Sequence, residues 1–84
     1  MNARQTSIES YHRLENLAEK RRKVYDIIDH MGEACNLDIA DNLGWDINRV
    51  TPRTNELVKD GMVEESKRDI SRTGRKVIYW RVKS

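Results

Sequence analysis

Apolar residues recur every three or four positions through the first part of the chain, which is the repeat of an amphipathic helix. The first run extends from Ser7, which is suited to cap a helix, to Met31, and Gly32 supplies a stop. Because the run is long for one helix of so small a protein, we expect a helical arm over residues 1–17 and a core helix over about 18–31. The apolar positions are Ile8, Tyr11, Leu14, Leu17, Val24, Ile27, Ile28 and Met31.

Two shorter helical patterns follow. Asn36 can cap the first and Gly44 ends it, while the second runs over about residues 47–60 and closes at Gly61. The apolar positions of the first are Leu37, Ile39, Ala40 and Leu43, and those of the second are Ile47, Val50, Thr54, Leu57 and Val58.

Pro52 allows two starting points for the later helix. If Asp46 or Asn48 is the cap, Pro52 falls in the first or second turn; if Thr51 is the cap, Pro52 takes the first helical position, where proline is well tolerated. We favour the earlier start, with a local distortion at Pro52, because the apolar stripe already begins at Ile47.

The end of the chain reads as strand, turn and strand. Met62–Lys67 is the first strand, and Lys76–Val82, rich in β-branched and aromatic residues, is the second. Residues 71–75 form the turn, in which Gly74 is free to adopt positive φ. Three side chains of the second strand share the face that we expect to point inward: Ile78, Trp80 and Val82.

The spacing within the two middle helices is more specific than either helix alone. Two helices joined by a tight turn cross closely, so they need a small residue at the crossing, a turn residue tolerant of left-handed φ, and a branched apolar residue to fill the wedge. Counting Asn36 as the first position, Ala40 is fifth, Gly44 ninth and Val50 fifteenth.

With this spacing, the segments Asn36–Gly44 and Ile47–Arg53 resemble the helix-turn-helix family in its winged form, as found in small bacterial and phage transcriptional regulators. The resemblance covers about residues 18–82. It implies an α+β fold in which a three-helix core and a C-terminal β-hairpin wing occupy residues 18–84, preceded by the helical arm over residues 1–17.

Arg53 departs from the pattern, because many simple helix-turn-helix motifs have an apolar residue there. Thr54 can take the core position instead, and the sequence leaves open which of the two points inward.

The resemblance implies double-stranded DNA as the partner, with helix 47–60 in the major groove and the wing, residues 67–76, on the backbone or in the minor groove. We expect Asn48, Arg49, Arg53 and Asn55 to read bases, and Pro52 to meet a thymine methyl. Thr51 and the wing arginines would contact the backbone. The full candidate set is Asn48, Arg49, Thr51, Pro52, Arg53, Asn55, Lys67, Arg68, Arg72, Arg75 and Lys76.

The charge is unevenly placed, although the net charge is only +2. Residues 61–84 carry seven basic and three acidic side chains, whereas residues 33–60 carry three basic and six acidic ones. The basic end suits a polyanion. The acidic middle weighs against DNA and keeps open the alternative of a winged helix that binds a protein partner. An accessory role in DNA replication or recombination is a further alternative, which the sequence does not separate from regulation.

A basic run, Lys20-Arg21-Arg22-Lys23, lies in the first core helix. We interpret it as the exposed side of that helix rather than as a phosphate clamp or a localisation signal.

The sequence lacks the residue patterns that other classes of function require. The single cysteine, Cys35, has no histidine at ligand spacing, so we expect a small buried side chain, no metal site and no cofactor. No nucleophile or acid pair stands in a catalytic pattern, so we expect no enzyme, and no small-molecule ligand is evident. No apolar run approaches a membrane span. We therefore expect a cytoplasmic protein (in the host-cell cytoplasm if phage-encoded). Two roles are open for the apolar side chains of the arm, Tyr11, Leu14 and Leu17: packing back on the domain, or forming a seam with a second copy. We favour the seam, and with it a homodimer, because the arm precedes the minimal winged-helix unit.

Overall fold

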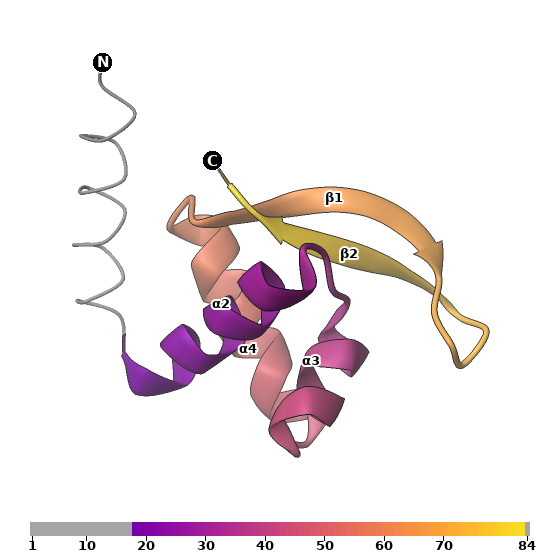
Figure 1. Cartoon of the computed structure of the whole chain (residues 1–84), viewed down its shortest axis with the longest axis horizontal. Helices are drawn as coiled ribbons and strands as arrows, with labels where there is room; N and C mark the ends of the chain where they lie inside the picture. Colours follow the sequence, from indigo (N-terminus) through magenta and orange to yellow (C-terminus); the bar gives the residue numbers. More distant parts are fainter. Residues whose placement is uncertain (1–17, 84) are drawn as a thin grey trace.

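The computed structural model describes residues 18–83, which form three helices followed by an antiparallel hairpin. Figure 1 shows α2 and α3 in front of α4, with the hairpin running above them and projecting past the helices. This is the predicted α+β order of three helices and a wing. The expected arm, with Tyr11, Leu14 and Leu17, lies outside the described residues. The bounds are α2 Glu19–Met31, α3 Asn36–Leu43, α4 Ile47–Lys59, β1 Val63–Ile70 and β2 Lys76–Val82.

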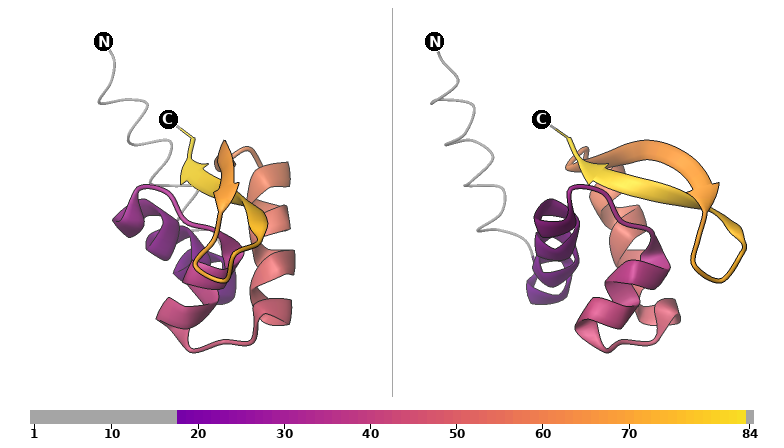
Figure 2. Two further views of the ribbon diagram at one scale, coloured as in Figure 1. Left: turned by 90° about the vertical axis from the view of Figure 1, so that its right-hand side faces the viewer. Right: turned by 45° about the vertical axis from the view of Figure 1, so that its right-hand side comes forward.

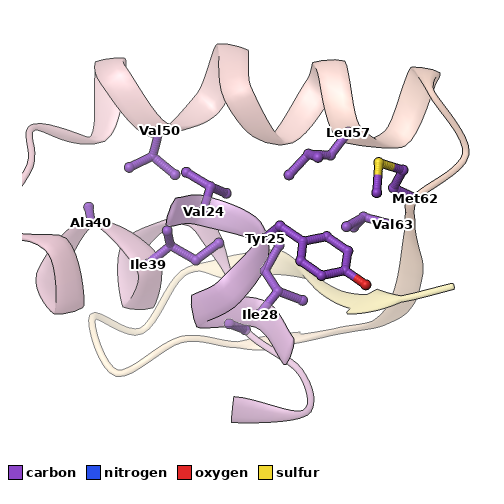
Figure 3. Close-up of a cluster of buried hydrophobic side chains, with 10 residues drawn as sticks. Val24, Tyr25, Ile28, Ile39, Ala40, Val50, Leu57, Met62 and Val63 are labelled. Carbon is purple, nitrogen blue, oxygen red and sulfur yellow. The ribbon is translucent and has the colours of Figure 1, made fainter. Parts of the chain in front are cut away.

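The core forms where all three helices meet the start of β1. Val50, Thr54 and Leu57, on one face of α4, are fully buried, and Figure 3 shows Val50 and Leu57 pointing at the side chains of α2 and α3. Thr54 therefore occupies the inward position that the sequence left open between it and Arg53. The α2, α3 and β1 side chains that complete this core include Val24, Tyr25, Ile28, Ile39, Ala40 and Val63.

The turn after α3 is closed by backbone hydrogen bonds. Gly44, at φ 69°, donates its N–H to the Asp41 carbonyl, and the Trp45 N–H donates to the Ala40 carbonyl at 2.9 Å. This pair of bonds is the Schellman arrangement, which needs a residue with positive φ and therefore favours glycine. Trp45 then packs against the core.

The start of α3 differs by one residue from the prediction. Cys35, in extended backbone, precedes the helix, and Asn36 is its first residue rather than its cap. The reason is that Ala34 is held in a β-bridge to Trp80, by hydrogen bonds of 2.9 and 2.8 Å, which extends the chain up to Cys35. Cys35 is buried, as expected for a small apolar side chain, and burial raises the pKa of its thiol.

The earlier start predicted for α4 is confirmed. Asp46 is the cap, and its Oδ1 accepts the Asn48 N–H at 2.8 Å. Pro52 lies inside the helix, where it cannot donate to the Asn48 carbonyl, on an exposed face where water can replace that bond. Ile47 was expected in the core stripe but is 42% exposed. As the first residue of α4 it lies at the rim of the buried face, where it lines a surface groove with Leu37 and Trp80.

The hairpin is longer than predicted on its first side, since β1 continues to Ile70. Its register shifts between Glu65, which faces Trp80, and Lys67, which faces Tyr79, so Ser66 is an extra residue in β1. Trp80 and Val82 pack against the core, as expected. Ile78 is only half-buried and lines a surface groove, because it lies farther out along the projecting hairpin.

The bulge at Ser66 ties the hairpin to the loop after α2. Neighbouring strand residues normally point to opposite faces, but here the Ser66 hydroxyl donates to Glu33 Oε1 at 2.8 Å while Lys67 Nζ lies 3.1 Å from Glu33 Oε2. These two contacts hold the pKa of Glu33 below its usual range and raise the pKa of Lys67. The base of the wing is thereby fastened to the helices.

Truncation of the α4 core should destabilise the protein far more than truncation of its surface. Leu57→Ala removes a fully buried side chain and should lower the free energy of unfolding by about 2–5 kcal/mol. Val58→Ala, on the same helix but 36% exposed, is the matched control and should cost well under half as much. Urea denaturation measures both, and equal losses would place Leu57 outside the core.

The Glu33 contacts should make part of the stability depend on acid pH. A carboxyl whose folded pKa lies below its ordinary value of 4.5 stabilises the fold fully above pH 4.5, and loses that contribution as the pH falls through the folded pKa. The free-energy difference between the protein and Glu33→Gln should therefore be constant from neutral pH to about 4.5 and shrink below it. Urea denaturation across pH tests this; a difference that persists undiminished at about pH 2 would contradict the assignment.

Candidate nucleic-acid interface

The face of α4 opposite the core is a stripe of polar residues. Asn48, Pro52 and Asn55, spaced by four and three, are exposed and lie on one side of the helix, and Lys59 continues the stripe one turn later. The structure thus brings together three of the residues predicted to touch DNA bases. Sequence reasoning omitted Lys59, although its spacing from Asn55 would have placed it on the same face.

A groove lies between this stripe and the wing. It measures about 420 Å³ and its apolar lining comes mainly from the start of α3, from Ile47 of α4 and from β2. Asn55 and Lys76 line it as well, so two predicted DNA-binding residues from different elements meet there. Asn36 is another lining residue. Its side-chain oxygen Oδ1 is buried and accepts no hydrogen bond from the described residues, 18–83. The full lining is Asn36, Leu37, Ile47, Asn55, Lys76, Val77, Ile78 and Trp80.

A smaller polar hollow of about 210 Å³ lies on the other flank of α4, beside α2. Arg49 and Arg53, which were predicted to read bases, both line it. The Arg49 guanidinium stacks over the Trp45 ring at 5.2 Å, and Arg53 Nε lies 3.0 Å from Glu56 Oε1. The full lining is Lys20, Trp45, Asn48, Arg49, Pro52 and Arg53.

Thr51 lies on the wing side of α4 and is half-exposed. Its hydroxyl donates to the Ile47 carbonyl at 3.1 Å, one turn back along the helix. The hydroxyl oxygen can still accept a further hydrogen bond.

The cations at the base of the wing are already paired with carboxylates. Lys67 contacts Glu33, and it also lies 5.1 Å from the centre of the Tyr79 ring that faces it across the sheet. Arg68 Nε lies 3.2 Å from Glu65 Oε2. Both side chains therefore help to shape the wing, whatever contact they make with a partner.

The cations at the tip of the wing are more available. Arg72 forms an ion pair with Asp41 of α3, which draws the tip toward the helices; Figure 2 shows the tip bending to that side. Arg75 and Lys76 are exposed, and no carboxylate within residues 18–83 pairs with either of them. The tip thus carries two uncommitted positive charges beside the groove.

Other kinds of site find little support in the described part of the chain. Within residues 18–83, no three side chains of His, Cys, Asp or Glu converge as metal ligands. No helix there has the length and apolar character needed to cross a membrane. The chemistry that residues 18–83 do gather is amide, guanidinium and ammonium groups around α4.

Solved structures with the same arrangement exist. One is described as a possible transcriptional regulator from Methanosarcina mazei Go1, with a TM-score of 0.68 and 14% identity over 93% of this chain. Another is the transcriptional regulator PA4135, with a TM-score of 0.63 and 19% identity over 96% of this chain. The chain spans 66% and 60% of the lengths of these two proteins. At these identities the likeness shows a shared fold.

Sequence comparison is more specific. No curated protein matches the chain at a significant level. The model of a winged helix-turn-helix DNA-binding family matches residues 17–64, which is more than half of the chain and includes α2, α3 and α4. The chain therefore belongs to the winged helix-turn-helix DNA-binding family.

Proposed function

We propose that this protein regulates transcription by binding double-stranded DNA, with α4 in the major groove and the wing on the adjacent backbone or minor groove. The observation that carries the proposal is the stripe of Asn48, Pro52 and Asn55 on the exposed face of a helix whose opposite face is buried. A major groove about 12 Å wide admits one helix with its side chains.

The chemistry of the stripe suits base edges. An asparagine side chain can donate to and accept from adenine in the major groove, and an apolar ring such as that of Pro52 can contact a thymine methyl. Asn48 and Asn55 lie about two turns apart along α4, so they would read different base pairs.

The wing supplies positive charge next to these readers. Arg75 and Lys76 have no carboxylate partner in residues 18–83, so phosphate oxygens can take that place without breaking an existing ion pair. Arg72 would exchange its ion pair with Asp41 for one with a phosphate. The hydroxyl oxygen of Thr51 would accept a hydrogen bond from a water molecule bound to the DNA backbone. Lys67 and Arg68 would add to the field around the base of the wing.

Support for a role in transcription comes from the two similar structures, both of which are described as transcriptional regulators, one of them as a possible one. A bacterial or phage source, and pairing of two copies through Tyr11, Leu14 and Leu17, stay predictions.

DNA binding should depend steeply on salt. Fluorescence anisotropy of a labelled random-sequence duplex should give a slope of log affinity against log salt of roughly −3 to −6, because each phosphate contact releases counterions. A chain that shows no binding at low salt would contradict the proposal and direct the search to a protein partner.

Binding to two duplexes should distinguish residues that contact bases from residues that contact phosphates. One duplex carries a site selected from a random library, and the other has a random sequence. Asn55→Ala should weaken binding to the selected site by about 1–3 kcal/mol and leave random DNA nearly unaffected, because it removes a base contact. Arg75→Ala should weaken binding to both duplexes alike. Equal losses on both duplexes for Asn55→Ala would remove it from the base-reading set.

A further inference from the structure

The hollow on the α2 side of α4 gathers cations from two helices that are far apart in the sequence. Lys20 comes from the first turn of α2, while Arg49 and Arg53 come from the first two turns of α4. Within the described residues, 18–83, no carboxylate lines the hollow. This hollow and the wing stand on opposite flanks of the polar stripe, because Arg49 and Arg53 point to one side of α4 and Ile47 and Asn55 line the groove on the other.

Two of these cations are held in place by neighbours. The Arg49 guanidinium rests on the Trp45 ring, and Arg53 is oriented by Glu56, which Arg21 also contacts at 3.4 Å. Arg21 reaches Asp60 at 3.5 Å as well. Within residues 18–83, Arg21 and Arg53 thus share two carboxylates, Glu56 and Asp60, whereas Lys20 and Arg49 form no ion pair, so the hollow carries an excess of positive charge.

We propose that Lys20, Arg49 and Arg53 form a subsite for a phosphodiester of the DNA strand that flanks α4 on the side away from the wing. The inference rests on the proposed function. A helix lodged in the major groove has a sugar–phosphate backbone along each flank, so the wing reaches one strand and this subsite reaches the other. Arginine forks match the paired oxygens of a phosphate, and lysine adds a point charge.

The proposal changes two roles and adds one residue. Arg49 and Arg53 contact the backbone rather than bases, which fits their position beside the polar stripe rather than in its centre. Lys20 joins the interface, although the sequence alone indicated that its basic run, residues 20–23, is only the exposed side of α2. The fold separates the members of that run: Lys20 lines the hollow, Arg21 binds Glu56, and Lys23 pairs with Glu19 at 3.6 Å.

The test compares two lysines of the same helix in the full chain. Lys20→Ala and Lys23→Ala each remove one positive charge from an exposed position of α2, but only Lys20 lines the hollow. Anisotropy titrations with the random-sequence duplex should show that Lys20→Ala reduces the magnitude of the salt slope by about 0.9, the value of one phosphate contact. Lys23→Ala should leave the slope at its original value.

A second comparison addresses the arginines. Arg49→Ala should raise the Kd by the same factor on a selected site and on random DNA, whereas a base contact would affect mainly the selected site. Thermal melting of each variant shows whether it is folded, and Lys20→Gln should reproduce Lys20→Ala because it also removes the charge.

The outcomes separate the subsite from the function. Suppose that the unaltered chain binds DNA and that Arg75→Ala lowers the magnitude of the salt slope. If Lys20→Ala and Lys23→Ala then have slopes equal to each other, the subsite is overturned and the proposed function stands. A loss confined to the selected site for Arg49→Ala also overturns the subsite. If the unaltered chain binds no DNA, the proposed function itself fails.

Discussion

The burial of one face of α4 is the constraint on which the other features depend. Val50, Thr54 and Leu57 are fully buried, and α2, α3 and β1 all pack against the helix that carries them. A helix can bury only one side without stranding its polar residues. By burying Val50, Thr54 and Leu57, the fold fixes which side chains of α4 stay exposed to a partner, and it does so before any partner binds.

The wing depends on its attachments, because a two-stranded hairpin alone is marginally stable in water. The Ala34–Trp80 bridge joins it to the chain between α2 and α3, the bulge at Ser66 brings it to Glu33, and Asp41 holds Arg72 near its tip. These contacts place the wing on one flank of α4. A wing positioned in advance loses less freedom on binding than a mobile one.

The acidic middle of the chain, which weighed against DNA binding, has a structural explanation. Glu33 pairs with Lys67, and Asp41 pairs with Arg72. Asp46 caps α4, and Glu56 orients two arginines. These carboxylates are engaged within the protein, where they orient basic side chains and cap α4. The surface beside α4 therefore combines neutral polar side chains at its centre with positive charge on both sides.

Patterns of residues close together in the sequence determined the secondary structure of this protein and indicated its family. Helical periodicity and the aspartate and glycine signals at helix ends were enough to predict three helices, and the β-branched and aromatic residues near the end of the chain were enough to predict the hairpin. The spacing of Ala40, Gly44 and Val50 predicted the family. Asn48, Pro52 and Asn55 were all among the residues assigned to DNA, and their spacing of four and three places them on one face of α4, because helical spacing depends only on residues close together in the sequence. The bulge at Ser66 and the exposure of Ile47 were not evident, because each depends on where the chain meets a distant segment or where a helix begins. Only tertiary structure could show that Lys20 lies beside Arg49 and Arg53, or that Arg72 reaches Asp41, because such pairs arise from helix packing that brings separated segments together.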